Sequence, residues 1–132
     1  MQIKYSPELL TDFHKLVADF AWFMSMNLLH ADKGLVPDKQ RKMQSLIKYS
    51  LDNCKQFNSI FTMPLLSNEA KNKDVLITNF QNIITFFYHY IKYANPILKE
   101  CKPDIYAGRF NKLIKHYKSF HHKHIGLLGG AS

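Results

Sequence analysis

The chain has 132 residues, a length typical of one domain, and 46% of them are hydrophobic, which supplies enough apolar mass for a core. A disordered chain and a disulfide-held miniature are therefore excluded. Eighteen Lys and Arg residues against ten Asp and Glu residues give a formal net charge of +8, and seven histidines add positive charge on mild acidification. This charge favours acidic partners and does not bear on the fold.

The first predicted helix begins at Pro7 and is ended by Gly34. Its apolar residues recur every three or four positions, as in an amphipathic helix, and they are Leu9, Phe13, Leu16, Val17, Phe20, Met24 and Leu28. Trp22, Met26 and Leu29 make the opposite face apolar as well. Such a helix either lies centrally in a bundle or offers a surface to a partner, and we favour central burial.

The second predicted helix begins near Val36-Pro37-Asp38, because proline suits the first turn and an acid there meets the positive end of the helix dipole. The predicted buried stripe of this helix is apolar apart from one serine. It consists of Met43, Leu46, Ile47, Ser50, Cys54, Phe57 and Phe61. The stretch from Thr62 to Lys73 contains a proline and is the longest predicted connection.

The third predicted helix starts around Asp74 and is rich in aromatic residues between Phe80 and Tyr93. Proline removes a backbone donor and clashes with the preceding turn. We therefore expect this helix to be kinked or broken near Pro96.

The fourth predicted helix opens after Pro103-Asp104 and frays into a glycine-rich end. Four amphipathic segments without the alternation of a strand predict an all-α, antiparallel four-helix bundle. Residues 1–125 form its single domain, and 126–132 form a flexible tail. The most apolar run, Phe20 to Leu29, is too short for a transmembrane segment. We expect a cytoplasmic protein, or one delivered into the cytoplasm of another cell.

The excess positive charge is concentrated at the end of the chain. Residues 1–104 carry a net charge of +3, whereas residues 105–132 contain five cations and no acid. The candidate binding residues, predicted to line one side of the last helix with a tyrosine at the edge, are Arg109, Lys112, Lys115, Lys118, Lys123 and Tyr117. This surface predicts an acidic protein or a nucleic acid as partner, and an ordinary solvated helix face explains the same residues. A membrane surface fits less well, because the apolar residues of this helix suit burial in the bundle.

Signatures of metal, cofactor or nucleophilic chemistry are missing from the sequence. The Glu-x-x-His pairs of di-iron bundles are absent, and no phosphate-cradling loop or nucleophile elbow is present. We therefore predict no metal site and no cofactor.

One constellation carries possible chemistry. Arg109 and His116 are separated by six residues, which matches a loose Arg-x(4–6)-His pattern and resembles the motif of HEPN-domain ribonucleases near their final helix. The resemblance implies metal-independent RNA cleavage in a dimeric cleft, with His116 in proton transfer and Arg109 stabilising charge on the phosphate. The fuller motif places asparagine directly after the arginine, and Phe110 stands there instead.

The sequence favours a small basic interaction module, of the adaptor, immunity, effector or inhibitor type, over an enzyme. Its partner is an acidic macromolecule bound through the C-terminal helix. The alternatives are the HEPN-like ribonuclease and a non-specific nucleic-acid-binding protein, and a homodimer stays open.

Overall fold

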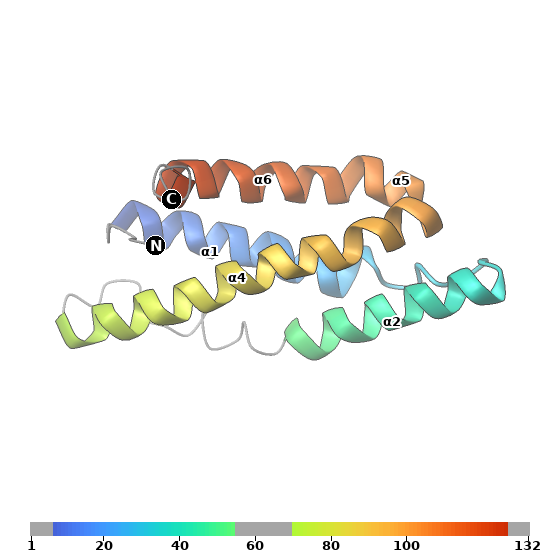
Figure 1. Ribbon diagram of the computed structural model, residues 1–132, viewed down its shortest axis with the longest axis horizontal. Coiled ribbons are helices and arrows are strands. Elements are labelled where there is room, and N and C mark those ends of the chain that lie inside the picture. The colour runs from blue at the N-terminus through green and yellow to red at the C-terminus, as the bar shows by residue number, and fades with distance from the viewer. Residues whose placement is uncertain (1–6, 55–69, 127–132) are drawn as a thin grey trace.

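The computed structural model describes residues 7–54 and 70–126, and these residues contain helices, turns and no strand. The helices are α1 (Pro7–Trp22), the π-helix η1 (Phe23–Asn27), α2 (Pro37–Cys54), α4 (Ala70–Cys101), α5 (Pro103–Ile105), the π-helix η3 (Tyr106–Phe110), α6 (Asn111–His121) and the π-helix η4 (His122–Gly126). Figure 1 shows the four long helices side by side, with successive helices running in opposite directions. The prediction of an all-α bundle is confirmed. No helix in the described part is long and apolar enough to cross a membrane.

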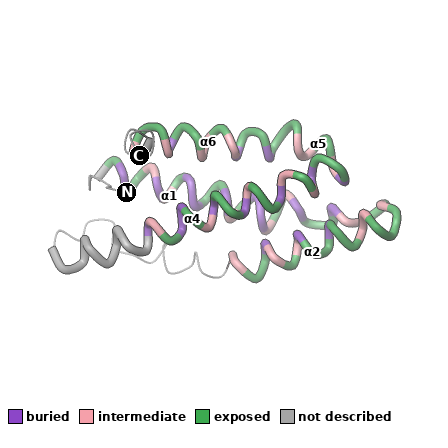
Figure 2. Tube along the Cα trace, viewed as in Figure 1, coloured by how far each residue is buried: buried purple, intermediate pink, exposed green. Residues whose placement is uncertain are grey.

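Aromatic side chains form much of the core. The Phe20 and Phe87 rings stack with their centroids 3.8 Å apart, and both side chains are fully buried. The Phe13 and Phe80 rings pack in a tilted arrangement with their centroids 4.3 Å apart, so these two pairs join α1 to α4. Buried positions alternate with exposed ones along each helix in Figure 2, as the periodicity of the sequence predicts.

Helix α2 packs against α4 through a buried polar pair. Ser50 is fully buried, and its hydroxyl donates to the Leu46 carbonyl oxygen at 2.7 Å. The Tyr90 hydroxyl lies 2.6 Å from the same Ser50 oxygen. Ser50 has one hydroxyl proton and gives it to Leu46, so Tyr90 is the donor to Ser50. Burial raises the pKa of Tyr90 far above its ordinary value.

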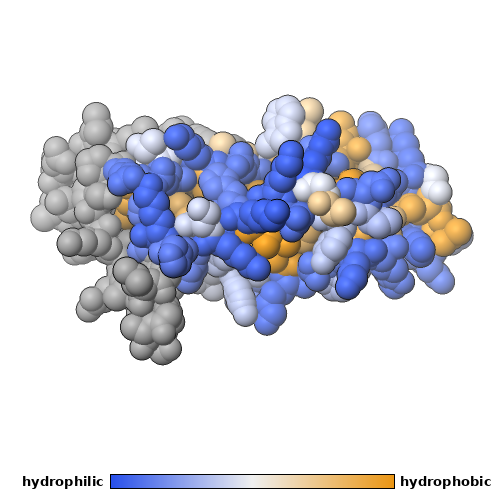
Figure 3. All heavy atoms as spheres, turned by 90° about the horizontal axis from the view of Figure 1, so that it is seen from above, coloured by the Kyte–Doolittle hydropathy of each residue, from blue (hydrophilic) through white to orange (hydrophobic). Residues whose placement is uncertain are grey.

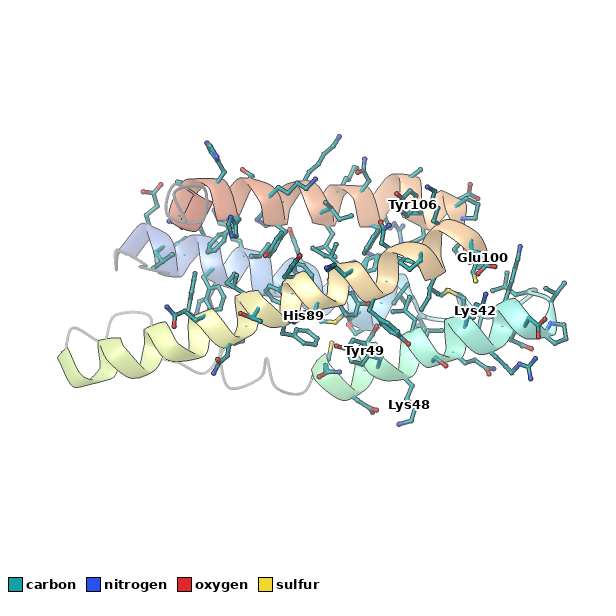
Figure 4. The ribbon with its side chains drawn as sticks, viewed as in Figure 1. Lys42, Lys48, Tyr49, His89, Glu100 and Tyr106 are labelled. Atoms are coloured by element: carbon teal, nitrogen blue, oxygen red, sulfur yellow. The ribbon has the colours of Figure 1, made fainter. Side chains whose placement is uncertain are left out.

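An ion pair links α2 to α4 at the exposed edge of their contact. Lys42 Nζ lies 2.7 Å from Glu100 Oε2, and Figure 4 shows the two side chains approaching each other from α2 and the end of α4. This hydrogen bond lowers the pKa of Glu100. The thiols of Cys101, which is buried, and Cys54, which is half-buried, are both free.

The first helix ends earlier than predicted. It leaves helical geometry after Asn27, and Gly34 lies in the following connection rather than at the helix end. His30 and Gly34 both have positive φ, at 62° and 78°, which reverses the chain toward α2. The apolar pattern continued to Leu28 because that residue and Ala31 are buried, although the backbone around them is no longer α-helical.

Helix α4 begins earlier than predicted, and of the two outcomes predicted near Pro96, a kink or a break, the break does not occur. The helix begins at Ala70, so the predicted connection from Thr62 ends before that residue, and the rest of that connection lies outside the described residues. The helix also continues through Pro96 without a break. Pro96 removes one backbone hydrogen bond, but Ala94 and Leu98 on either side are fully buried, and their packing holds the helix. The predicted end of the second helix and the Gly129-Gly130 tail also lie outside the described part.

Candidate interaction site on the last helix

Acidic side chains of α1 contact basic side chains of η4, the helix that continues α6. Lys123 pairs with Glu8, and its Nζ lies 3.0 Å from Asp12 Oδ2. His124 Nε2 lies 2.8 Å from the same Asp12 oxygen. The hydrogen bonds from His124 and Lys123 lower the pKa of Asp12, although partial burial opposes the shift. Lys123 therefore forms ion pairs that link η4 to α1.

Two further residues of the predicted site also contact the first helix. His116 hydrogen-bonds to Asp19 through Nδ1, and Arg109 donates from Nη1 to Asn27 Oδ1 at 2.8 Å. The charge density of the last helix is thus lower on this side than its sequence indicates.

Three lysines of α6 have no ion-pair partner among the residues that the structure describes. Lys112, Lys115 and Lys118 are exposed, and none of them forms an ion pair with any residue in the described ranges 7–54 and 70–126. By contrast, Lys42 and Lys48 of α2 each pair with a carboxylate. The free positive charge of α6 therefore lies on its solvent-facing surface. Figure 3 looks onto this face and shows mainly hydrophilic side chains, with hydrophobic atoms visible between them.

An open groove of about 610 Å³ lies between α4 and the last helix, and Lys118 is the one of these three lysines that lines it. Helix α4 contributes Thr85 and Tyr88 to its wall, and α6 contributes Tyr117, Lys118 and His121. Burial raises the pKa of Tyr117, so its hydroxyl stays protonated and available as a hydrogen-bond donor. The groove combines aromatic surface with cationic side chains, which suits an acidic ligand with apolar parts.

The predicted binding residues do not share one side of the helix. Tyr117 and Lys118 line the α4 groove, whereas Arg109 and Lys112 line a second hollow against α1 and η1, and Lys123 pairs with acids of α1. The cations of η3, α6 and η4 are thus spread around the last helix between the α1 flank and the α4 flank.

The structure does not bring Arg109 and His116 together. Arg109 lies within η3, which continues directly into α6, so the pair lies seven positions apart on a continuous helix, a rise of roughly 10 Å. Arg109 lines the hollow beside Trp22, and His116 lines another hollow with Asp12. No cluster of three metal-binding side chains occurs among the residues that the structure describes.

Sequence reasoning missed the role of the second apolar strip of the first helix. Trp22, Met26 and Leu29 are 60%, 47% and 54% exposed, so the expectation of central burial is wrong. The core takes Phe23 and Met24 instead. The signal was present in the sequence, because a helix with two apolar faces and only one buried face leaves the other at the surface.

No protein-family model, curated protein or solved structure matches the chain. Function is therefore inferred from the surface of this chain alone.

Proposed function

We propose that the protein is a non-enzymatic interaction module that binds an acidic macromolecular partner through α6. The observation that carries this proposal is the row of Lys112, Lys115 and Lys118, which is exposed and without ion pairs in the part of the chain described. Acids are available on α1, but they pair with Lys123 and with histidines on the flank of α6. The partner supplies the anions that the bundle does not.

The groove beside Lys118 adds affinity that charge alone lacks. Exposed ion pairs contribute little individually, about 0.2–1 kcal/mol each, and are screened by salt. Tyr88 and Tyr117 provide aromatic surface at the groove, and Lys92 Nζ lies 5.1 Å from the centroid of the Tyr88 ring. Aromatic residues are enriched at the centres of protein interfaces. The lysines then select a negatively charged partner, and the groove supplies contact area.

A capture experiment tests the proposal and separates an acidic protein from a nucleic acid. Immobilised wild-type protein is incubated with native lysate, with and without nuclease, at several salt concentrations. The test variant replaces Lys112, Lys115 and Lys118 with Gln. A matched control replaces Lys15, Lys33 and Lys99 with Gln, which removes the same charge from exposed positions elsewhere.

We expect the α6 variant to capture its partner about tenfold less well at low salt, since three exposed contacts sum to roughly 1.5 kcal/mol. The control should behave as wild type. Loss of capture after nuclease treatment would identify the partner as nucleic acid. Equal capture by the α6 variant and wild type at every salt concentration would refute the proposal.

A further inference from the structure

A hollow of about 460 Å³ lies where the two π-helices η1 and η3 meet. The Phe23 and Phe110 rings, one from each π-helix, pack 5.5 Å apart between centroids and are both buried. The Arg109–Asn27 hydrogen bond joins the same two segments at the surface. π-Helices are rare and occur often at functional sites. The base of this hollow is therefore aromatic, and its rim carries the Arg109 guanidinium.

The hollow lies on a strip of exposed apolar side chains. Trp22 and Met26 line it, and Leu29, in the turn that follows η1, is a further exposed apolar residue. Trp22 and Met26 lie four positions apart, across the junction of α1 and η1. Exposed apolar surface beside a hollow is what a helix of a partner covers when it binds in a groove.

The charges around the hollow select the occupant. Arg109 and Lys112 stand at its α6 side and form no ion pair within residues 7–54 and 70–126. Asp19, the acid in the lining, hydrogen-bonds to His116, so the lining holds two cations and one acid. A second copy of this chain would bring another net charge of +8 to a basic rim, and the resulting repulsion disfavours a homodimer here.

We infer that this hollow docks an acidic amphipathic helix of a protein partner. The apolar face of that helix covers Trp22, Met26 and Leu29, and its carboxylates pair with Arg109 and Lys112. Tryptophan, methionine and arginine are the residue types enriched in interface cores, and arginine binds carboxylates in a bidentate manner. The inference rests on the proposed function and narrows its partner from any acidic macromolecule to a protein.

Trp22 is the only tryptophan in the chain, so its fluorescence reports directly on the hollow. The probe is a tryptophan-free 18-residue peptide with Leu at helical spacing and Glu at the other positions. A scrambled peptide of the same composition lacks the apolar stripe and serves as the control. We expect the first peptide to shift Trp22 emission to shorter wavelength and to reduce acrylamide quenching at least twofold, because it covers a side chain that is 60% exposed.

Two surface variants locate the binding site. Met26→Ala and Arg109→Gln should each weaken peptide binding about tenfold, as expected for anchors near the centre of an interface. Leu51→Ala removes an exposed leucine from α2 and should leave binding unchanged. Circular dichroism confirms that each variant keeps its helices.

Four results would overturn the inference. One is that the peptide binds without changing Trp22 emission. Another is that the scrambled peptide binds equally well, and a third is that a 20-nucleotide RNA produces the same protection of Trp22. A spectral shift on raising the concentration of the protein alone would assign the strip to a second copy and would also overturn it. Failure of the proposed function is distinguished by lysate capture that is insensitive to Lys112, Lys115 and Lys118.

Discussion

The buried hydrogen bond between Tyr90 and Ser50 gives an asymmetric prediction for stability. Ser50→Ala leaves the Tyr90 hydroxyl buried without its acceptor, since Tyr90 is fully buried and donates to Ser50. Tyr90→Phe removes the donor, and Ser50 keeps its own hydrogen bond to the Leu46 carbonyl. Ser50→Ala therefore breaks two hydrogen bonds and strands a buried donor, whereas Tyr90→Phe breaks one and strands none.

The magnitudes follow from this difference. An unsatisfied buried polar group costs about 1–3 kcal/mol, and an ordinary net hydrogen bond about 0.5–1.5 kcal/mol. We expect Ser50→Ala to lower the free energy of unfolding by about 2 kcal/mol and Tyr90→Phe by about 1 kcal/mol. The double variant should lose about 1–1.5 kcal/mol, well below the sum, because it removes donor and acceptor together.

Urea unfolding of the four proteins, followed by circular dichroism at pH 7, measures this cycle. The same proteins can be compared at alkaline pH. The folded-state pKa of Tyr90 is raised by burial, so its stabilising contribution is present below the ordinary tyrosine pKa near 10 and is lost as pH rises above it. The loss should reach about 1.4 kcal/mol per pH unit and be missing from Tyr90→Phe. Additive single variants, or a larger loss for Tyr90→Phe than for Ser50→Ala, would refute this assignment of donor and acceptor.

Three other predictions concern the core, the α1–α6 contact and the ribonuclease alternative. Phe23→Ala should cost about 3–5 kcal/mol of stability and the neighbouring Trp22→Ala no more than about 0.5 kcal/mol, because the first side chain is buried and the second is 60% exposed; thermal unfolding would contradict this if the two shifts were equal. The lowered folded-state pKa of Asp12 provides stability that is present above its ordinary value near 3.8 and is lost as pH falls through the folded value, so Asp12→Asn should flatten the acid side of a plot of melting temperature against pH, and an unchanged plot would count against the His124 contact. Purified protein incubated with RNA in EDTA should show no cleavage sensitive to Arg109→Ala or His116→Ala, since the structure keeps these side chains apart, whereas cleavage lost in both variants would restore the ribonuclease alternative.

The helices were predictable because each carries a buried stripe at helical spacing. Phe13, Leu16 and Phe20 recur in the sequence as they do in the core. Boundaries were harder, and the reason lies in tertiary packing. Pro96 is a helix breaker locally, but the burial of Leu98 beyond it stabilises the helical path.

The candidate site was predictable in composition and not in arrangement. The acid-free end of the sequence located the cations, but Asp12 and His124 are 112 positions apart, and no local pattern announces their contact. For the same reason the sequence did not show which lysines stay free. The exposure of Trp22 also depended on how the bundle closes, since a helix with two apolar faces is compatible with either burial or display.

The directions in which the charged side chains of α6 point depend on the number of residues in η3. A π-helical turn closes its hydrogen bonds over five residues instead of four, so it holds one residue more than the α-helical turn it replaces. Deleting one residue from η3 would restore the α-helical repeat and rotate every later side chain by about 100° around the axis. Lys112, Lys115 and Lys118 would then turn away from their present directions, and Lys123 would lose its alignment with Glu8 and Asp12. A single-residue deletion in η3 would thus act on the whole basic surface at once, as no point substitution does.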